Sequence, residues 1–171
     1  MNEHTMHPNP RSSHPPRRQL LLATGLLAAA ALSGCSMFGG PAVLNAQVVA
    51  SAQVNPDARK RPSPVVVRIF ELKAPTLFEQ ADFVSLFEKD QAVLGPELVS
   101  REEFVMRPGE TKPVTKPLSP DTKFIGVMVA FRELERARWR AVVPVAAGKK
   151  NVVSIDLSDI TVQVKRSSPK L

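Results

Sequence analysis

The stretch Val65-Val66-Val67-Arg68-Ile69-Phe70-Glu71-Leu72 decides the fold class of this chain. Six of its eight residues are apolar, and a proline-rich segment precedes it. An apolar run of this length, rich in β-branched residues and bounded by turn signals, is typical of a strand that is buried on both faces. The stretch therefore predicts a strand in the middle of a β-sheet.

Further strands are expected on both sides of this stretch. Apolar and polar residues alternate from Ala46 to Val54, as in a half-buried strand. The run from Phe124 to Phe131 is apolar on both faces and predicts a second central strand. Residues 111–118 carry Pro113 and Pro117, which only an edge strand tolerates well. The remaining strands are expected near residues 104–106, 139–145, 153–157 and 160–164. About eight strands at these spacings predict a mainly β, antiparallel β-sandwich.

A short helical insertion is expected at about residues 75–95. Its apolar residues recur at helical spacing, and its phenylalanines are interpreted as core packing. Thr76 and Glu79 form a candidate capping box, and Asp82 is a candidate cap for a second short helix. Gly95-Pro96 ends the helical pattern.

The N-terminal segment has the pattern of an export signal. Arg17-Arg18 precedes an apolar run from Leu20 to Leu32, which at thirteen residues is shorter than the roughly twenty needed to cross a bilayer. Leu32-Ser33-Gly34-Cys35 closely resembles the lipobox of bacterial lipoproteins, in which the chain is cut before the cysteine and the cysteine is lipidated. We expect residues 1–34 to be a signal peptide, rather than an uncleaved anchor helix or a core helix. The arginine pair leaves twin-arginine export open beside the ordinary Sec route.

The mature protein is expected to begin at Cys35, the lipidation site. Residues 35–45 then form a lipidated tether, residues 46–166 the β-sandwich domain and residues 167–171 a polar tail. An aspartate after the cysteine tends to retain Gram-negative lipoproteins in the inner membrane. Ser36 stands there instead, which points to the inner face of the outer membrane. More than one acyl chain on the cysteine gives stable anchoring.

The histidine count limits the activities that are open to the mature protein. His4, His7 and His14 all precede Cys35, and the chain has no tyrosine. Catalysis by Ser-His-Asp or Cys-His groups is therefore excluded from the mature protein, and so is the usual histidine or thiolate zinc site. The sequence predicts no cofactor apart from the covalent acyl lipid.

The net charge favours an acidic partner. The whole chain carries +7, and three of its 23 basic residues and one of its 16 acidic residues precede Cys35, which leaves 20 against 15, or +5. This charge suits an acidic protein surface or anionic lipid headgroups. It does not indicate nucleic-acid binding, because no aromatic side chains interleave the basic residues.

Three groups of carboxylates are candidates for chemistry, and none predicts an active site. Glu102-Glu103 would point to opposite faces of a strand. Glu133 and Glu135 stand among arginines and are interpreted as a surface charge network, because a catalytic pair also needs a pocket. Asp156 and Asp159 flank a turn and supply too few oxygen ligands for calcium.

A ten-residue loop between the first two predicted strands is the main candidate binding site. It is longer than most hairpin loops, contains three prolines and carries a basic triplet. Loop statistics alone leave a binding role and a merely solvated loop equally open. The candidate residues are Asn55, Pro56, Asp57, Ala58, Arg59, Lys60, Arg61, Pro62, Ser63 and Pro64.

Several motifs along the expected mature domain together resemble one known family, the TssJ lipoproteins of the bacterial type VI secretion system. The motifs are Val54-Asn55-Pro56-Asp57, residues 61–73, Phe78, Ala81-Asp82-Phe83, Ser85-Leu86-Phe87, Leu94-Gly95, Arg107-Pro108-Gly109-Glu110, Gly126-Val127, Ala130-Phe131-Arg132 and Trp139-Arg140.

The resemblance implies a transthyretin-like β-sandwich with a small helical insertion, and a structural, non-enzymatic role. TssJ proteins lie on the inner face of the outer membrane and hold the periplasmic C-terminal domain of TssM, which forms the membrane complex together with TssL. In that family the loop between the first two strands is a main contact with TssM. Carried over to this chain, that loop is residues 55–64.

A lipoprotein that carries or hydrolyses a small ligand in the periplasm is the alternative. Transthyretin-like folds host such chemistry elsewhere. The absence of histidine from the expected mature protein argues against hydrolysis, and the few aromatic residues argue more weakly against a ligand pocket.

Overall fold

The computed structural model describes residues 40–167. The expected signal peptide, the lipidation site Cys35 and the tail residues 168–171 lie outside the described residues. In chain order the elements are β1 (Val43–Ala50), β2 (Val65–Leu72), α2 (Thr76–Gln80), α3 (Phe83–Leu94), the 3-10 helix η1 (Gly95–Glu97), β3 (Leu98–Met106), β4 (Thr111–Pro117), β5 (Phe124–Ala130), β6 (Arg140–Pro144), β7 (Lys150–Ser158) and β8 (Thr161–Ser167).

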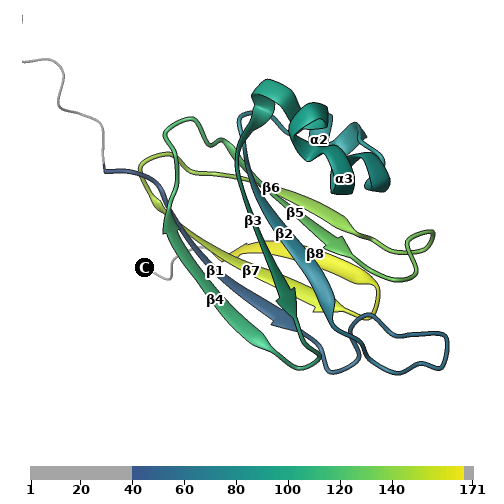
Figure 1. Cartoon of the computed structure of the whole chain (residues 1–171). Helices are drawn as coiled ribbons and strands as arrows, with labels where there is room; N and C mark the ends of the chain where they lie inside the picture. The colour runs from purple at the N-terminus through teal and green to yellow at the C-terminus, as the bar shows by residue number, and fades with distance from the viewer. Residues whose placement is uncertain (1–39, 168–171) are drawn as a thin grey trace, which may run out of the picture. The chain divides into compact units, whose positions relative to one another are not determined.

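The eight strands of the described residues form two four-stranded sheets, which make the expected β-sandwich (Figure 1). One sheet has the order β4-β1-β7-β8 and the other the order β3-β2-β5-β6. β2 lies between β3 and β5 and is buried along most of its length, which confirms that it is a central strand. β5 is also internal, and β4, which carries the two prolines, is an edge strand as predicted.

The expectation of a purely antiparallel sandwich is wrong for one pair of strands. β1 and β7 run parallel, with Val43 opposite Lys150 and Ala50 opposite Leu157, so the sheet β4-β1-β7-β8 is mixed. The connection from β6 crosses to the other sheet and starts β7 at the end where β1 also starts. Neighbouring strands that start at the same end of a sheet are parallel, and such a pair requires a crossover connection.

The first strand lies earlier in the chain than its polar alternation indicates. β1 begins at Val43 instead of Ala46, because Leu44 is fully buried and pairs in the sheet. Part of the segment that was expected to be tether is therefore strand. The strand ends at Ala50, and the N–H of Val54 donates to the carbonyl of Ser51 at 3.2 Å in the turn that follows.

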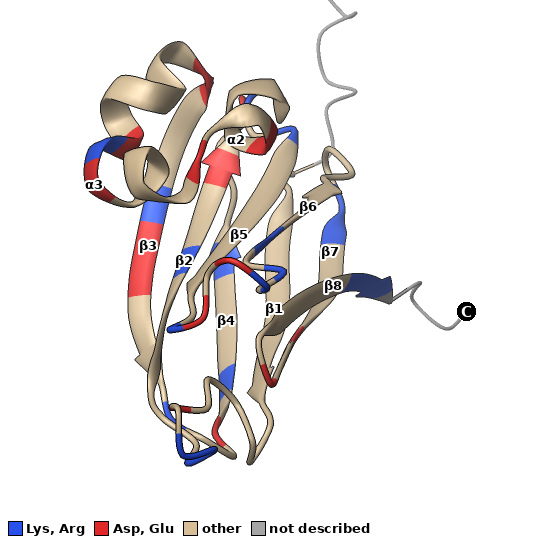
Figure 2. Cartoon of the chain, turned by 90° about the vertical axis from the view of Figure 1, so that its right-hand side faces the viewer, with Lys and Arg blue, Asp and Glu red and all other residues tan. Residues whose placement is uncertain are grey.

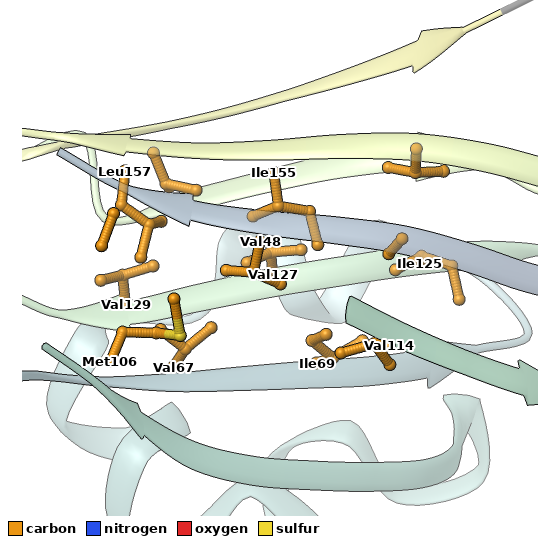
Figure 3. Close-up of a cluster of buried hydrophobic side chains, with 14 of the residues drawn as sticks. Val48, Val67, Ile69, Met106, Val114, Ile125, Val127, Val129, Ile155 and Leu157 are labelled. Carbon is orange, nitrogen blue, oxygen red and sulfur yellow. The ribbon is translucent and has the colours of Figure 1, made fainter. Parts of the chain in front are cut away.

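The main core lies between the two sheets. Side chains from both sheets point into one layer, among them Val48, Ile155 and Leu157 from one sheet and Val67, Val127 and Val129 from the other (Figure 3). All of these side chains are almost completely buried. Burying one such aliphatic side chain contributes about 1.5–3 kcal/mol, so this layer dominates the stability of the domain.

A second cluster attaches the helical insertion to the outer face of the sheet β3-β2-β5-β6 (Figure 1). Its fully buried members come from the sheet and from the helices: Phe70, Leu72, Met128, Phe78, Leu86 and Leu94. The phenylalanines of the insertion are therefore packing residues, as expected.

The two helix caps that the sequence suggests have different outcomes. Asp82 caps α3, because its carboxylate accepts a hydrogen bond from the N–H of Ser85 at 2.9 Å. The capping box of Thr76 and Glu79 does not form. Pro75 is the N-cap of α2 and makes no side-chain hydrogen bond to it. The first turn of α2 is instead bound by Glu97, whose carboxylate accepts a hydrogen bond from the N–H of Leu77 at 3.1 Å.

The two charged residues of the central strand are both buried and both paired. Arg68 lies on the outer face of the sheet, where it donates to the carbonyl of Phe87 in α3 and to the carboxylate of Glu103 in β3. Glu71 lies at the other face and bonds to Lys116 of the opposite sheet at 2.7 Å. Each charge therefore connects β2 to a different neighbouring layer.

The sandwich has two ends, which we call the entry end and the loop end. At the entry end, the chain enters β1 beside the β6–β7 turn, where the N–H of Val43 donates to the carbonyl of Lys149 at 3.0 Å. At the loop end, the N–H of Asn55 donates to the carbonyl of Asp159 in the β7–β8 turn at 2.7 Å. β1 joins the two ends (Figure 1). At the usual rise of a strand, its eight residues span about 26 Å.

Candidate partner-binding loop

Asn55 holds the base of the candidate loop. It adopts a left-handed backbone conformation with φ of 51°, which asparagine tolerates better than most residues. Its side chain is 2 % exposed, donates to the carbonyl of Pro64 at 2.8 Å and accepts from the N–H of Arg132 at 2.8 Å. One side chain thus closes the β1–β2 loop and fastens it to the β5–β6 connection.

Asp57 organises the tip of the loop. Its carboxylate accepts hydrogen bonds from the backbone N–H groups of Arg59 and Arg61 at 2.8 and 2.9 Å, and it pairs with the guanidinium of Arg61 at 2.7 Å. The side-chain and backbone hydrogen bonds from Arg61 hold the pKa of the Asp57 carboxyl below its ordinary value of 3.8. Lys60 takes a left-handed conformation with φ of 63°, which lets the tip turn tightly. The tip is therefore a preformed structure.

The ten predicted residues divide into two groups. Asn55 and Ser63 are buried and have a structural role, and the N–H of Ser63 donates back to the carbonyl of Val54 at 3.1 Å. The exposed residues are Ala58, Arg59, Lys60, Arg61, Pro62 and Pro64, while Pro56 and Asp57 are half-buried. A partner can thus contact the tip, and within it Arg59 and Lys60 form no ion pair with any residue of the described range 40–167.

A groove of about 480 Å³ lies beside the loop. Its lining residues from the loop are Pro56, Asp57, Ala58 and Lys60, and those from the β5–β6 connection are Arg132, Glu133 and Arg136. Sequence reasoning missed this second set, although the run of alternating charges was visible. It assigned the run to a surface charge network, and Glu133 does pair with Arg136 at 2.8 Å. Arg132, Glu133 and Arg136 lie near the loop because Asn55 contacts Arg132. The sequence alone does not reveal this contact.

The other carboxylates have structural or surface positions. Glu103 pairs with the buried Arg68, and Asp156 accepts from the hydroxyl of Ser154 at 2.9 Å. Asp159 occupies a turn with φ of 52°. Within the described part of the chain, no group of three or more metal-binding side chains comes together. A second surface cavity of about 470 Å³ lies between α3 and β3 and is lined by Asp90, Gln91, Gly95, Leu98, Val99, Ser100 and Arg101.

Comparison with known families identifies the fold. Residues 42–166 match a family model described as type VI secretion lipoprotein, VasD, EvfM, TssJ. The chain belongs to this TssJ family. The match spans all the strands of the sandwich except the last residue of β8, and it confirms the resemblance that the sequence motifs indicate.

Solved structures support the same assignment. The chain is similar to the type VI secretion lipoprotein TssJ1 of Pseudomonas aeruginosa, with 30 % identity, a TM-score of 0.74 and coverage of 77 % of this chain and 100 % of that one. It is also similar to a chain of a structure described as a type VI membrane complex, with 27 % identity, a TM-score of 0.64 and coverage of 72 % and 97 %. A third match is in a structure described as the TssM C-terminal domain from EAEC, with 27 % identity, a TM-score of 0.61 and coverage of 71 % and 99 %. A search of curated proteins finds no match.

As a member of this family, the chain is a type VI secretion lipoprotein. No helix among residues 40–167 has the length and apolar character that a membrane span needs.

Proposed function

We propose that this TssJ protein is anchored to the inner face of the outer membrane by acyl lipid on Cys35 and holds the periplasmic C-terminal domain of TssM at its loop end. Similarity to a chain in a structure described as the TssM C-terminal domain supports this partner. TssL joins the same assembly through TssM, without direct contact with this chain.

The geometry of the loop end is the observation that carries the proposal. The tip of residues 57–61 is held by its own hydrogen bonds, so a partner loses little conformational entropy when it binds there. The groove beside it adds Arg132, Glu133 and Arg136, which widens the surface beyond the loop. A rigid basic edge next to a mixed-charge groove fits an acidic protein surface that also presents a few basic groups.

The position of the loop also suits this role. Cys35 stands eight residues before Val43, where β1 enters the fold. The loop lies at the opposite end, about 26 Å away along β1. A protein that is anchored through its entry end would present the loop end to the periplasm, where the domain of TssM is located.

Calorimetric titration of residues 36–171 against the periplasmic C-terminal domain of the cognate TssM tests the proposal. The informative variant is Arg59→Ala with Lys60→Ala, because these side chains are exposed and leave the Asp57–Arg61 pair intact. Lys149→Ala with Lys150→Ala removes the same charge at the entry end and is the matched control.

We expect saturable binding that the loop variant weakens at least tenfold and the control leaves unchanged. Equal affinity of the loop variant and the native domain for TssM would show that TssM binds at another surface than the loop. A folded domain that does not bind TssM would refute the proposed partner.

A further inference from the structure

We propose that the entry end of the sandwich is a docking surface for the anionic headgroups of membrane phospholipids. This inference rests on the proposed lipid anchor at Cys35, and it concerns a surface separate from the loop end. It is argued from three unpaired basic side chains beside the point where the chain enters the fold and from two more on the adjoining flank of the sheet.

The strand order gathers distant basic residues at the entry end. Val43 lies opposite Lys150 in the parallel pair with β7, and its N–H binds the carbonyl of Lys149. β8 runs back along β7 toward this end, with Lys165 opposite Ser154 and Arg166 opposite Val153, so these two residues lie on the flank of the sheet between its middle and the entry end. Figure 2 shows basic residues where β7 begins and where β8 ends.

Lys123 completes the set from the β4–β5 connection. This connection is held at the entry end, because the N–H of Leu118 donates to the carbonyl of Ala42 at 2.8 Å. The N–H of Val145, which follows β6, donates to the carbonyl of Lys123 at 2.7 Å. Lys123 therefore lies beside the β6–β7 turn that carries Lys149 and Lys150.

These five side chains keep their full charge for an external partner. Lys123, Lys149, Lys150, Lys165 and Arg166 are all exposed, and none forms an ion pair with any residue that the structure describes. The other two lysines at this end differ. Lys73 pairs with Asp121 at 3.1 Å, and Lys116 pairs with the buried Glu71 at 2.7 Å.

Three carboxylates at the entry end are already engaged. Asp121 and Glu71 hold the two lysines, and Glu97 accepts from the backbone of Leu77. Glu79 and Glu97 form no ion pair with any described residue, so five unpaired basic side chains stand against two unpaired carboxylates and the net charge is positive. Such a surface is complementary to lipid phosphates, which attract juxtamembrane basic residues.

The covalent anchor brings this particular end to the membrane. Seven residues lie between Cys35 and Val43, so the chain between them makes eight residue-to-residue steps and spans at most about 28 Å. Electrostatic attraction to headgroups acts within a Debye length of about 8 Å. The tether permits this approach when its end-to-end span is about 8 Å or less, or when it lies along the membrane surface. A lipid anchor combined with a basic surface gives a second membrane attachment and orients the domain.

The test measures vesicle binding by the unlipidated domain, residues 36–171, which retains every strand and both apolar clusters. The probes are vesicles of phosphatidylcholine alone and of an equal mixture of phosphatidylglycerol and phosphatidylcholine. The variant is Lys123→Gln, Lys149→Gln and Lys150→Gln. The matched control is Arg59→Gln, Lys60→Gln and Arg107→Gln, which removes three exposed charges from the loop end and leaves the Asp57–Arg61 pair intact.

We expect the native domain to sediment with the anionic vesicles and not with the neutral ones, more weakly at higher salt. Each entry-end charge that is removed should weaken binding about fivefold, while the loop control binds as the native domain does. Equal losses for the two triple variants would show that net charge alone is responsible and would overturn the proposal. No preference for anionic vesicles would overturn it as well.

Two further measurements separate this inference from the proposed function. Incorporation of labelled palmitate into Cys35 in cells reports the anchor, and calorimetry with TssM reports the loop end. A domain that is lipidated and binds TssM but ignores anionic vesicles would refute the docking surface alone.

Discussion

The side chain of Asn55 accepts a hydrogen bond at 2.8 Å from the backbone N–H of Arg132, which lies 77 residues further along the chain. This contact joins the β1–β2 loop to the β5–β6 connection and creates the groove between them. Asn55, which the sequence suggests as one residue of a binding loop, is therefore the residue that positions the proposed binding surface.

Replacing Asn55 should destabilise the domain and displace the groove. Asn55→Ala removes the partners of the carbonyl of Pro64 and the N–H of Arg132, which we expect to cost about 2 kcal/mol in the free energy of unfolding. Asn55→Gly loses the same hydrogen bonds but accepts the positive φ without strain, so it should cost less. Urea unfolding of both variants checks this order, and a more stable alanine variant would contradict it.

Asp57→Ala should loosen the tip of the loop without affecting the core. The substitution removes the acceptor for two backbone N–H groups and for Arg61, so the tip must be ordered when the partner binds. We expect the affinity for TssM to fall about threefold to tenfold while the melting temperature stays the same. Asp57→Asn keeps an acceptor for the backbone N–H groups, so its affinity for TssM should lie between those of the native domain and Asp57→Ala. Calorimetry of the three proteins measures the effect, and an unchanged affinity for Asp57→Ala would count against a preformed tip.

Glu71 should make the stability of the domain depend on acid pH. Burial raises the pKa of its carboxyl, but four hydrogen-bond donors outweigh this effect and hold the pKa below its ordinary value of 4.5. The donors are Lys116, Thr122, Ser100 and the backbone N–H of Ser119. Because the folded pKa is lowered, the stabilisation is complete above pH 4.5 and is lost as the pH falls through the folded pKa.

The variant Glu71→Gln tests this dependence. We expect it to lower the free energy of unfolding by about 2 kcal/mol at neutral pH and to lose that disadvantage well below pH 4.5. Glu135→Gln, at an exposed position in the β5–β6 connection, serves as the control and should have no effect. If the free energies of unfolding of Glu71→Gln and the native domain differ by the same amount at neutral pH and well below pH 4.5, the charge of Glu71 does not stabilise the fold.

Gly126→Ala should disturb the contact between β5 and α2. A Cβ atom at this position would lie 3.0 Å from Cδ1 of Leu72 and 3.1 Å from Cζ of Phe78, and both side chains are fully buried. We expect a loss of about 1–3 kcal/mol from overpacking, measured by thermal unfolding. Gly40→Ala is the control, since a Cβ there meets no atom within 4 Å. A neutral effect at position 126 would mean that the helical insertion shifts freely on the sheet.

Local patterns were sufficient for the strands and for part of the insertion. β2 was predictable because a strand covered on both faces needs apolar residues in succession. Its two charged residues, Arg68 and Glu71, are tolerated because each is paired with a polar group. The cap at Asp82 was predictable because it bonds to a residue three positions away. The capping box at Thr76 failed because a carboxylate 20 residues away, that of Glu97, satisfies the helix instead.

The sequence by itself determined the sandwich class, the candidate loop and the family, since alternation, proline placement and short motifs are properties of neighbouring residues. Only the tertiary structure decided that β1 and β7 are parallel, that Arg132, Glu133 and Arg136 lie beside the loop, and that the unpaired lysines gather at the entry end. These relations join residues that are far apart in the chain. They depend on how the two sheets pack and in which order the strands pair, and no local pattern encodes that order.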